Sequence, residues 1–305
     1  MKNKDAFSFY HPLVNFLYFA LVITFAMFFC NPIAQIISLA SALAYAAQLS
    51  GRRALGRSLL FLLPVVAVAV IVNPAFNHQG ATTLTYLPTG NPLTLESILY
   101  GIYAALLLAS VIIWFQCYTE VMTSDKFIYL FGRVIPALSL VLSMTLRFVP
   151  KFKAQMQAVT EAQRCVGRDV SEGSVWRRAR TAITILSILV TWALENAIET
   201  ADSMKSRGYG LPGRTAFSIY RFDSRDRLAL LWLGFCGFFI CSGWMAGGFY
   251  WRYYPTVKGG PVTPLTALFF LGYLTLCLTP VVLDKWEDRA WKRLARNMEA
   301  GSCGI

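Results

Sequence analysis

Apolar runs that approach the length of a membrane span recur along this chain, separated by short polar or basic segments. A helix needs about 20 mostly apolar residues to cross the hydrocarbon core of a bilayer. The runs interpreted as spans occupy residues 13–30, 33–49, 59–72, 93–115, 228–249 and 265–283. This pattern predicts an all-α fold, that of a polytopic helical membrane protein with about six transmembrane helices.

The middle of the chain has a different pattern, which is typical of long amphipathic helices. Between residues 151 and 167, apolar residues recur at three- and four-residue steps with polar residues between them. A second long helix is predicted over 174–207, with Ser171 or Ser174 as its N-cap. Its acidic residues on one face are Glu195, Glu199 and Asp202. That face is a solvated surface, a local partner of Lys205 or a contact for partner helices.

These patterns divide the chain into three parts. Residues 1–125 are expected to hold the first four spans, and 213–305 the last two spans and a basic tail. Between them, residues 126–212 are expected to form a cytoplasmic or interfacial region of long amphipathic helices.

The distribution of Lys and Arg predicts which segments face the cytoplasm. Residues 51–58, the middle region and the tail after residue 283 are rich in these residues, whereas 73–95 contains none. Basic loops stay on the cytoplasmic side of a membrane. The expected protein is therefore a multi-pass protein of the cell membrane with both termini in the cytoplasm.

A further apolar helix, predicted over residues 126–148, tests this topology. If it crossed the membrane alone, the basic segment after it would lie outside, against the charge rule. It is therefore expected to lie in or dip into the cytoplasmic interface, with an even pair of extra crossings as the alternative. The apolar run at 180–195 also leaves both placements open, on the membrane or across it.

The segment 73–95, which lacks Lys and Arg, alternates threonine with apolar residues and is interpreted as a short hairpin or a re-entrant piece. Its turn is expected at residues 88–90. Asn91 and Pro92 are expected as the N-cap and first residue of the helix that follows. Glu96, in the first turn of that helix, is expected to have a structural role rather than to carry protons.

Composition and charge narrow the chemistry. Hydrophobic residues make up 56% of the chain and charged residues 14%. The net charge of +12 does not predict a nucleic-acid partner, because Lys and Arg flank apolar runs as in membrane loops. With seven cysteines but no CxxC pair, two histidines and no phosphate-binding loop, no metal site, catalytic residue or bound cofactor is expected.

The second long helix is predicted to end with a charged tip. Helix formers continue up to Arg207, and Gly208 stops the helix. A guanidinium presents a planar fork of donors that matches a carboxylate. The tip is therefore a candidate for binding a groove on another protein, and the alternative is that Arg207 is one more positive charge on the cytoplasmic side.

Four stretches together resemble the transmembrane T component of energy-coupling-factor (ECF) transporters, the modular ATP-driven importers of vitamins and transition-metal ions. They are residues 73–101, 124–152, 161–167 (EAQRCVG) and 195–210 (ENAIETADSMKSRGYG). The resemblance implies two cytoplasmic ABC ATPase subunits as partners, which use ATP and Mg²⁺, and one membrane-embedded substrate-binding S component. It also implies that this chain is a non-catalytic scaffold in the lipid bilayer.

That family docks its ATPases through two Ala-Arg-Gly-type motifs, one at the end of each coupling helix. The second motif is matched by Ser206-Arg207-Gly208, with serine in place of alanine. The first aligns with Cys165-Val166-Gly167, so Val166 stands where arginine is expected. The resemblance leaves Arg164 or Arg168 to supply the missing charge, and Asp202 as a further auxiliary contact.

Two other classes of function are alternatives. A polytopic membrane enzyme, such as a lipid-group transferase, would need polar groups that converge within the spans, and Glu96 and Arg133 do not converge by spacing. A stand-alone secondary transporter would show two matching halves or charges at mid-membrane. Neither feature is evident in the sequence, and the transported substrate cannot be identified from it.

Overall fold

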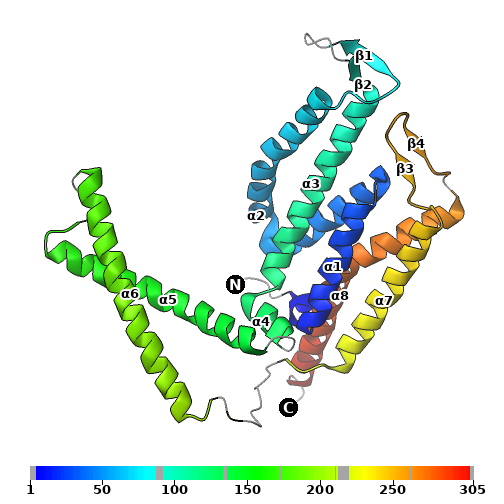
Figure 1. Ribbon diagram of the computed structural model, residues 1–305. Helices are drawn as coiled ribbons and strands as arrows, with labels where there is room; N and C mark the ends of the chain where they lie inside the picture. The colour runs from blue at the N-terminus through cyan, green and yellow to red at the C-terminus, as the bar shows by residue number, and fades with distance from the viewer. Residues whose placement is uncertain are drawn as a thin grey trace. The chain divides into compact units, whose positions relative to one another are not determined.

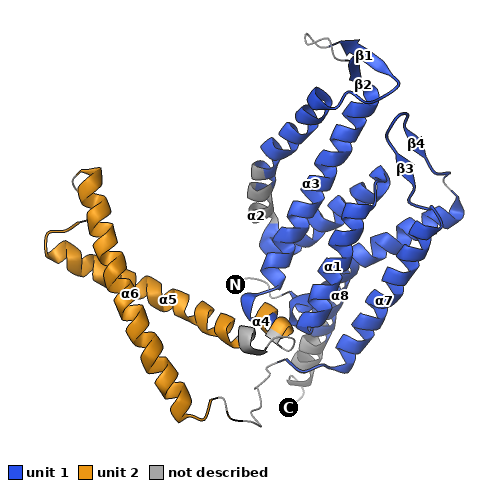
Figure 2. Ribbon diagram, viewed as in Figure 1, with its two compact units in different colours: residues 1–126, 220–305 blue, residues 127–219 orange. Residues whose placement is uncertain are grey.

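The computed structural model describes residues 5–86, 92–132, 136–169, 171, 174–209, 211, 220–261 and 263–302. Helices form nearly all of the secondary structure in these ranges, with two short hairpins, so the predicted all-α fold is confirmed. The chain divides into two compact units, shown in Figure 2. Unit 1 comprises Met1–Lys126 and Tyr220–Ile305, and unit 2 comprises Phe127–Ile219.

Unit 1 is a group of apolar helices (Figure 1). Its helices are η1 (Ala6–Phe9), α1 (Pro12–Phe28), α2 (Pro32–Phe76), α3 (Leu95–Val121), α7 (Ser224–Met245) and α8 (Pro264–Ser302). Helix α4 (Ser124–Gly132) begins in unit 1 and continues into unit 2, which also holds α5 (Pro136–Cys165) and α6 (Val175–Ser206). Among the described residues, the helices long and apolar enough to cross a membrane are Pro32–Gly51, Leu95–Val121, Val175–Ser206, Ser224–Met245 and Pro264–Trp291. The chain is thus a multi-pass membrane protein.

The predicted spans fall on these helices with two differences. The first and third predicted spans correspond to the shorter apolar helices Pro12–Phe28 and Leu62–Phe76. Helix α6, predicted to run along the membrane or across it, meets the length and composition of a span, although little of it is buried.

The basic segment 51–58 was expected to be a loop, and this prediction is wrong because helix α2 continues through it. The backbone departs from helical geometry at Gly51, with φ of 76° and ψ of 160°. Positive φ is accessible to glycine at little cost, while the Arg, Ala and Leu residues that follow favour a helix. The basic segment therefore belongs to a helix that is broken at one residue.

The hairpin interpretation of the segment before α3 is confirmed. Strand β1 (Thr83–Tyr86) pairs antiparallel with β2 (Pro92–Thr94). The expected start of the next helix at Asn91 and Pro92 is wrong, because Pro92 pairs in β2 and Thr94 is the N-cap of α3. The predicted turn at 88–90, like Asn91, lies outside the described residues.

Glu96 has the structural role that its position suggested. Its carboxylate accepts hydrogen bonds from the Thr82 backbone N–H at 3.3 Å and from the Thr82 hydroxyl at 2.6 Å. The side chain is 2% exposed. Glu96 therefore ties the segment that leads into β1 to the first turn of α3.

The helices of unit 2 begin and end at positions different from those predicted. The prediction of a single helix over 126–148 is wrong, because α4 ends at Gly132 and α5 begins at Pro136. Arg133 lies outside the described residues. Pro136 suits the first turn of a helix, where a missing N–H leaves no bond unmade. The expected division between the helices over 126–148 and 151–167 is also wrong, because α5 continues through Pro150. Ser174 is the N-cap of α6, as one of the two predictions had it.

The core of unit 1 combines aromatic rings with a few satisfied polar groups. Tyr18, Phe19 and Trp114 are almost fully buried and meet edge to face. Trp114 Nε1 donates to the Ser38 hydroxyl at 3.0 Å, and the Tyr18 hydroxyl donates to the Cys277 carbonyl at 2.9 Å. Because buried polar groups are costly without partners, these bonds help to specify how α1, α2, α3 and α8 pack.

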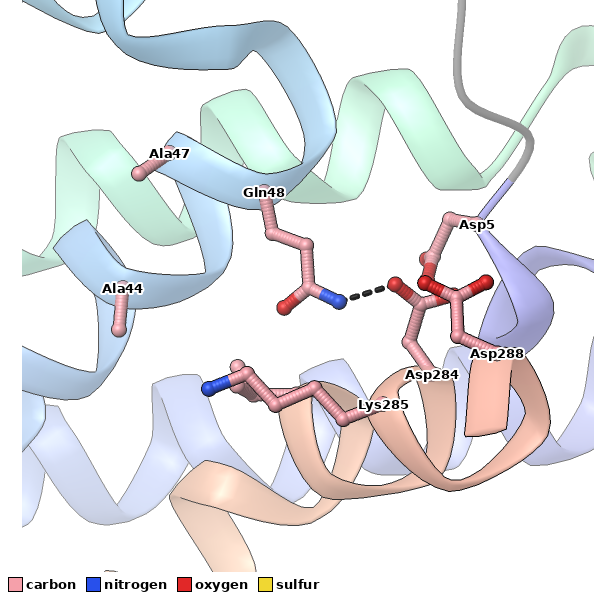
Figure 3. Close-up of a pocket in the computed structure, with 8 residues that line it drawn as sticks. Asp5, Ala44, Ala47, Gln48, Asp284, Lys285 and Asp288 are labelled. Atoms are coloured by element: carbon pink, nitrogen blue, oxygen red, sulfur yellow. Dashed lines mark hydrogen bonds between the residues drawn. The ribbon is translucent and has the colours of Figure 1, made fainter. Parts of the chain in front are cut away.

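The N-terminal segment closes one end of unit 1 beside a cavity of about 340 Å³ (Figure 3). The Ala6 N–H donates to Asp284 Oδ1 at 2.9 Å, and Gln48 also donates to the Asp284 carboxylate. The Tyr45 hydroxyl donates to Asp5 Oδ2 at 2.6 Å. The cavity is lined by Asp5, Ala44, Ala47, Gln48, Val281, Asp284, Lys285 and Asp288.

Asp5 should make the stability of unit 1 depend on pH. Burial raises the pKa of Asp5 from 3.8 to about 6, with the hydrogen bond from Tyr45 opposing the rise and the charge of Asp284 adding to it. The associated stability is fully present below the ordinary pKa and is lost as the pH rises through about 6. Melting in detergent should therefore show a loss on the order of 1 to 3 kcal/mol from about pH 5 to about pH 7.5.

The variant Asp5→Asn should flatten this pH profile, because its side chain cannot ionise. The exposed Asp288→Asn variant, at the rim of the same cavity, should keep the profile of the unmodified chain. An unchanged pH profile in Asp5→Asn would show that another group is responsible.

The contact between α7 and α8 should be sensitive to one added methyl group. A Cβ at Gly243 would lie 2.6 Å from the Phe269 ring, so Gly243→Ala should lower the melting temperature and cost about 1–3 kcal/mol. Gly234 lies in the same helix with nothing within 4 Å of such a Cβ. Gly234→Ala should match or exceed the stability of the unmodified chain, since alanine favours a helix. Equal melting of both variants would contradict this packing.

Candidate functional site

Helices α5 and α6 of unit 2 cross and pack against each other (Figure 1). The rings of Phe152 and Trp192 meet edge to face, with centroids 5.4 Å apart. The Lys151 ammonium donates to Asn196 Oδ1 at 3.0 Å and lies 5.7 Å from the Trp192 ring centroid. Each helix continues for roughly 20 Å past this crossing, at 1.5 Å per residue, before it ends. The two ends lie on different arms of the cross.

Helix α6 has two apolar faces, of which one is covered. Its buried residues recur at four-residue steps and are Thr181, Ile185 and Leu189. Trp192 and Asn196, which contact α5, continue the same face. The large apolar residues at least 60% exposed elsewhere on the helix include Trp176, Ile183, Leu186 and Leu194. An exposed apolar stripe of this length marks a surface for lipid or for another protein.

The C-terminal end of α5 is a Schellman motif, in which a glycine with positive φ closes the helix. Gly167 has φ of 75°. The Gly167 N–H donates to the Arg164 carbonyl at 3.0 Å, and the Arg168 N–H donates to the Gln163 carbonyl at 2.9 Å. These bonds satisfy carbonyls that would otherwise lack a partner at a helix end.

The C-terminal end of α6 repeats this geometry. Gly208 has φ of 77°. The Gly208 N–H donates to the Lys205 carbonyl at 3.0 Å, and the Tyr209 N–H donates to the Met204 carbonyl at 3.0 Å. The predicted helix end is therefore confirmed, and the two helix tips have the same backbone hydrogen bonds.

The matching bonds place the residues of the two tips in register. Cys165, Val166 and Gly167 correspond one by one to Ser206, Arg207 and Gly208, as the sequence alignment of the motifs suggested. Arg164 corresponds to Lys205, and Arg168 to Tyr209. The side chains of Cys165, Val166, Ser206 and Arg207 are exposed. Each triplet lies at its own helix end, so the structure does not bring the two motifs together.

The auxiliary residues differ in their surroundings. Arg164 Nε lies 3.1 Å from Asp169 Oδ2, in an ion pair within the same tip. Arg168 and Asp202 are exposed, and Asp202 lies in the last turns of α6 before the tip. The role of Asp169 was not anticipated, although an acidic residue a few positions after Arg164 was a visible signal.

The chemistry of these tips is that of a contact surface. The described residues include no group of three or more His, Cys, Asp or Glu side chains placed to hold a metal ion. What the tips offer is the exposed guanidinium groups of Arg164, Arg168 and Arg207, the exposed Val166 and two helix ends closed by the same backbone hydrogen bonds. Such ends can enter grooves on a partner protein.

Comparison with known proteins identifies the family of the chain. Residues 7–217 match the CbiQ family, described as cobalt transport protein. The chain is also similar to proteins named energy-coupling factor transporter transmembrane protein EcfT. That of Bacillus selenitireducens is 34% identical over 112 residues, which are 36% of this chain and 42% of that protein. That of Lactobacillus helveticus is 35% identical over 97 residues, or 32% and 35% of the two chains.

The similarity to these relatives covers less than half of their length. The family match, by contrast, spans well over half of this chain and includes both helix tips. It confirms the predicted resemblance, and the chain belongs to the CbiQ family, the T-component family that its sequence resembles.

Proposed function

We propose that this chain is the membrane scaffold of an ECF-type ABC importer, which couples ATP hydrolysis by two cytoplasmic ATPase subunits to uptake of a vitamin or metal ion. The observation that carries the proposal is the pair of equivalent helix tips on crossed helices. Two rigid ends, each roughly 20 Å of helix beyond one crossing, suit attachment to two ATPase subunits.

The mechanism requires that ATP binding changes the contacts at these tips. Closing of the ATPases moves the α5 and α6 ends, and the crossing at Phe152 and Trp192 carries the motion to the rest of unit 2. Motion is transmitted only if the helices bind the two ATPase states with different free energies. ATP and Mg²⁺ are used by the partners, and this chain is non-catalytic.

The substrate-binding partner is a separate membrane-embedded S component. The exposed apolar stripe of α6 is the surface that we assign to it, because such a stripe favours an apolar partner in or beside the bilayer. In this arrangement both termini and the ends of α5 and α6 lie on the cytoplasmic side, where basic segments are retained.

The environment of the polar groups in the spans favours a scaffold over a membrane enzyme. Gln35 donates to the Ala26 and Phe29 carbonyls, and Ser38 accepts from Trp114. Glu96 is held by Thr82. These groups are used for packing rather than gathered around a shared space.

Reversing the charge of the α6 tip should abolish association with the ATPases. In Arg207→Glu, a carboxylate would face the acidic groove that the guanidinium fits. Such a reversed charge pair should lower the affinity by at least about 100-fold, which is on the order of 3 kcal/mol. Co-purification of ATPases with the tagged chain from detergent measures this.

The matched control is Lys153→Glu, an equal charge change at an exposed position of α5 away from its tip. Lys153→Glu should retain the ATPases. Membrane insertion should be normal in both variants, and ATPase recovery with Arg207→Glu at the usual level would refute docking through Arg207.

The native Cys165 allows a test of the sidedness of the tips. Cys165 is an exposed free cysteine at the end of α5. In a variant with the other six cysteines replaced, a membrane-impermeant maleimide should label Cys165 in inside-out vesicles and not in intact cells. Cys165→Ser in that background provides the blank. Labelling from outside intact cells would place the tips on the wrong side for a cytoplasmic motor.

A further inference from the structure

The cavity at the end of unit 1 is lined by a buried carboxylate with one unused oxygen. Asp5 is 7% exposed, and its Oδ2 accepts from the Tyr45 hydroxyl at 2.6 Å. Within the part of the chain that the structure describes, Asp5 Oδ1 has no hydrogen-bond donor. A buried acceptor without a partner is costly, so a ligand that brings a donor into the cavity would be stabilised there.

Two further carboxylates line the same cavity. Asp284 accepts from the Ala6 N–H at 2.9 Å and from Gln48, and its negative charge acts on Asp5. Asp288 follows one helical turn later in α8 and is exposed. Figure 3 shows the three carboxylates gathered at one end of the cavity. This end combines negative charge with acceptors, which suits a cation that carries N–H donors.

The remainder of the cavity wall has the opposite charge. Ala44 and Ala47 of α2 and Val281 of α8 contribute small or apolar side chains. The exposed Lys285 extends away from the carboxylates and toward Ala44 (Figure 3). A ligand with an ammonium at one end and an anionic group at the other would therefore find a partner for each charge.

The cavity lies where two of the candidate spans end. Gln48 is in the last turn of the span Pro32–Gly51, and Asp284 and Lys285 are near the end of Pro264–Trp291. The neighbouring Trp286 is 67% exposed, as is typical of tryptophan at the level of lipid headgroups. The volume of about 340 Å³ is that of a small-ligand site, for which roughly 300–1,000 Å³ is usual.

We infer that this cavity binds a phosphoethanolamine group, the headgroup of an aminophospholipid, with its ammonium at Asp5 and its phosphate at Lys285. A primary ammonium has three N–H donors, enough for Asp5 Oδ1 and the neighbouring carboxylates. A metal ion is a poorer match, because no group of three or more His, Cys, Asp or Glu among the described residues is placed to hold one. The inference concerns unit 1 alone and does not depend on docking of the α5 and α6 tips.

The test compares three probes by their effect on the melting of the purified full-length chain in detergent. They are a phosphatidylethanolamine, the phosphatidylcholine with the same acyl chains, and free phosphoethanolamine. The ethanolamine lipid should bind at least about tenfold more tightly than the choline lipid, because a trimethylammonium has no N–H to donate. Free phosphoethanolamine that binds as tightly as the lipid would identify a soluble ligand of the same chemistry, and weaker binding identifies the membrane lipid.

Binding of the ethanolamine lipid should tighten as the pH rises. Burial raises the pKa of Asp5 to about 6, so its carboxylate is mostly neutral at pH 5 and ionised at pH 7.5. Affinity should increase about tenfold across this interval, opposite to the stability of the lipid-free chain. The other titratable groups that face Asp5 or line the cavity are Tyr18, Tyr45, Cys117, Lys126, Asp284, Lys285 and Asp288.

Variants at the two ends of the cavity should have different effects. Asp5→Asn should abolish the preference for ethanolamine over choline, whereas the exposed Asp125→Asn, outside the cavity, should keep it. Lys285→Gln should weaken both lipids on the order of fivefold, because both carry the phosphate. The exposed Lys258→Gln, also outside the cavity, should weaken neither.

Several results would overturn the inference. Equal binding of the two lipids by the unmodified chain would exclude recognition of the ammonium, and so would an ethanolamine preference that survives in Asp5→Asn. Stabilisation by Mg²⁺ without any effect of lipid would indicate a metal site. A preference that appears only after Lys2→Gln and Lys4→Gln would show that the chain supplies its own ammonium. If Asp5→Asn does not fold, the exposed Lys285→Gln and the choline comparison still decide.

Discussion

The closing of a helix by its own backbone is the constraint on which the proposed site depends. At the ends of α5 and α6, the last carbonyls accept from N–H groups on and just after a glycine with positive φ. Because the backbone satisfies these carbonyls, the side chains of Val166 and Arg207 are not needed for capping, whereas the Ser206 hydroxyl donates to the Ser203 carbonyl at 2.9 Å. Cys165, Val166, Ser206 and Arg207 are exposed.

Within unit 1, hydrogen bonds hold the segment that ends where the chain enters unit 2. Lys126, the residue at that boundary, donates to the Ser8 and Val121 carbonyls. Burial lowers the pKa of Lys126 to about 8, with Asp5 opposing the change. The N-terminal segment is held in turn by Asp284 and Asp226, which accept from the Ala6 and His11 N–H groups. The start of α4 is thus tied to the chain end and to α3.

The parts of this structure that could be predicted from the sequence are those determined by the residue types at a few neighbouring positions. Glycine after a run of helix formers marked the helix ends at Gly167 and Gly208, because little else accepts positive φ. The failures occurred where two local signals compete. The predicted division between residues 148 and 151 is wrong because α5 continues through Pro150, and the predicted helix start at Pro92 is wrong because Pro92 pairs in a strand. The sequence alignment of the two motifs gave the register of the two tips, and the backbone hydrogen bonds show the same register.

The common backbone and the different side chains of the tips impose separate requirements on any partner. The helix lengths beyond the crossing at Phe152 and Trp192 are similar, so each tip lies at a similar distance from that contact. The exchange of guanidinium for valine gives the two tips different side-chain chemistry at the same backbone position. A contact made at both tips can therefore use their common backbone geometry but not a common charge.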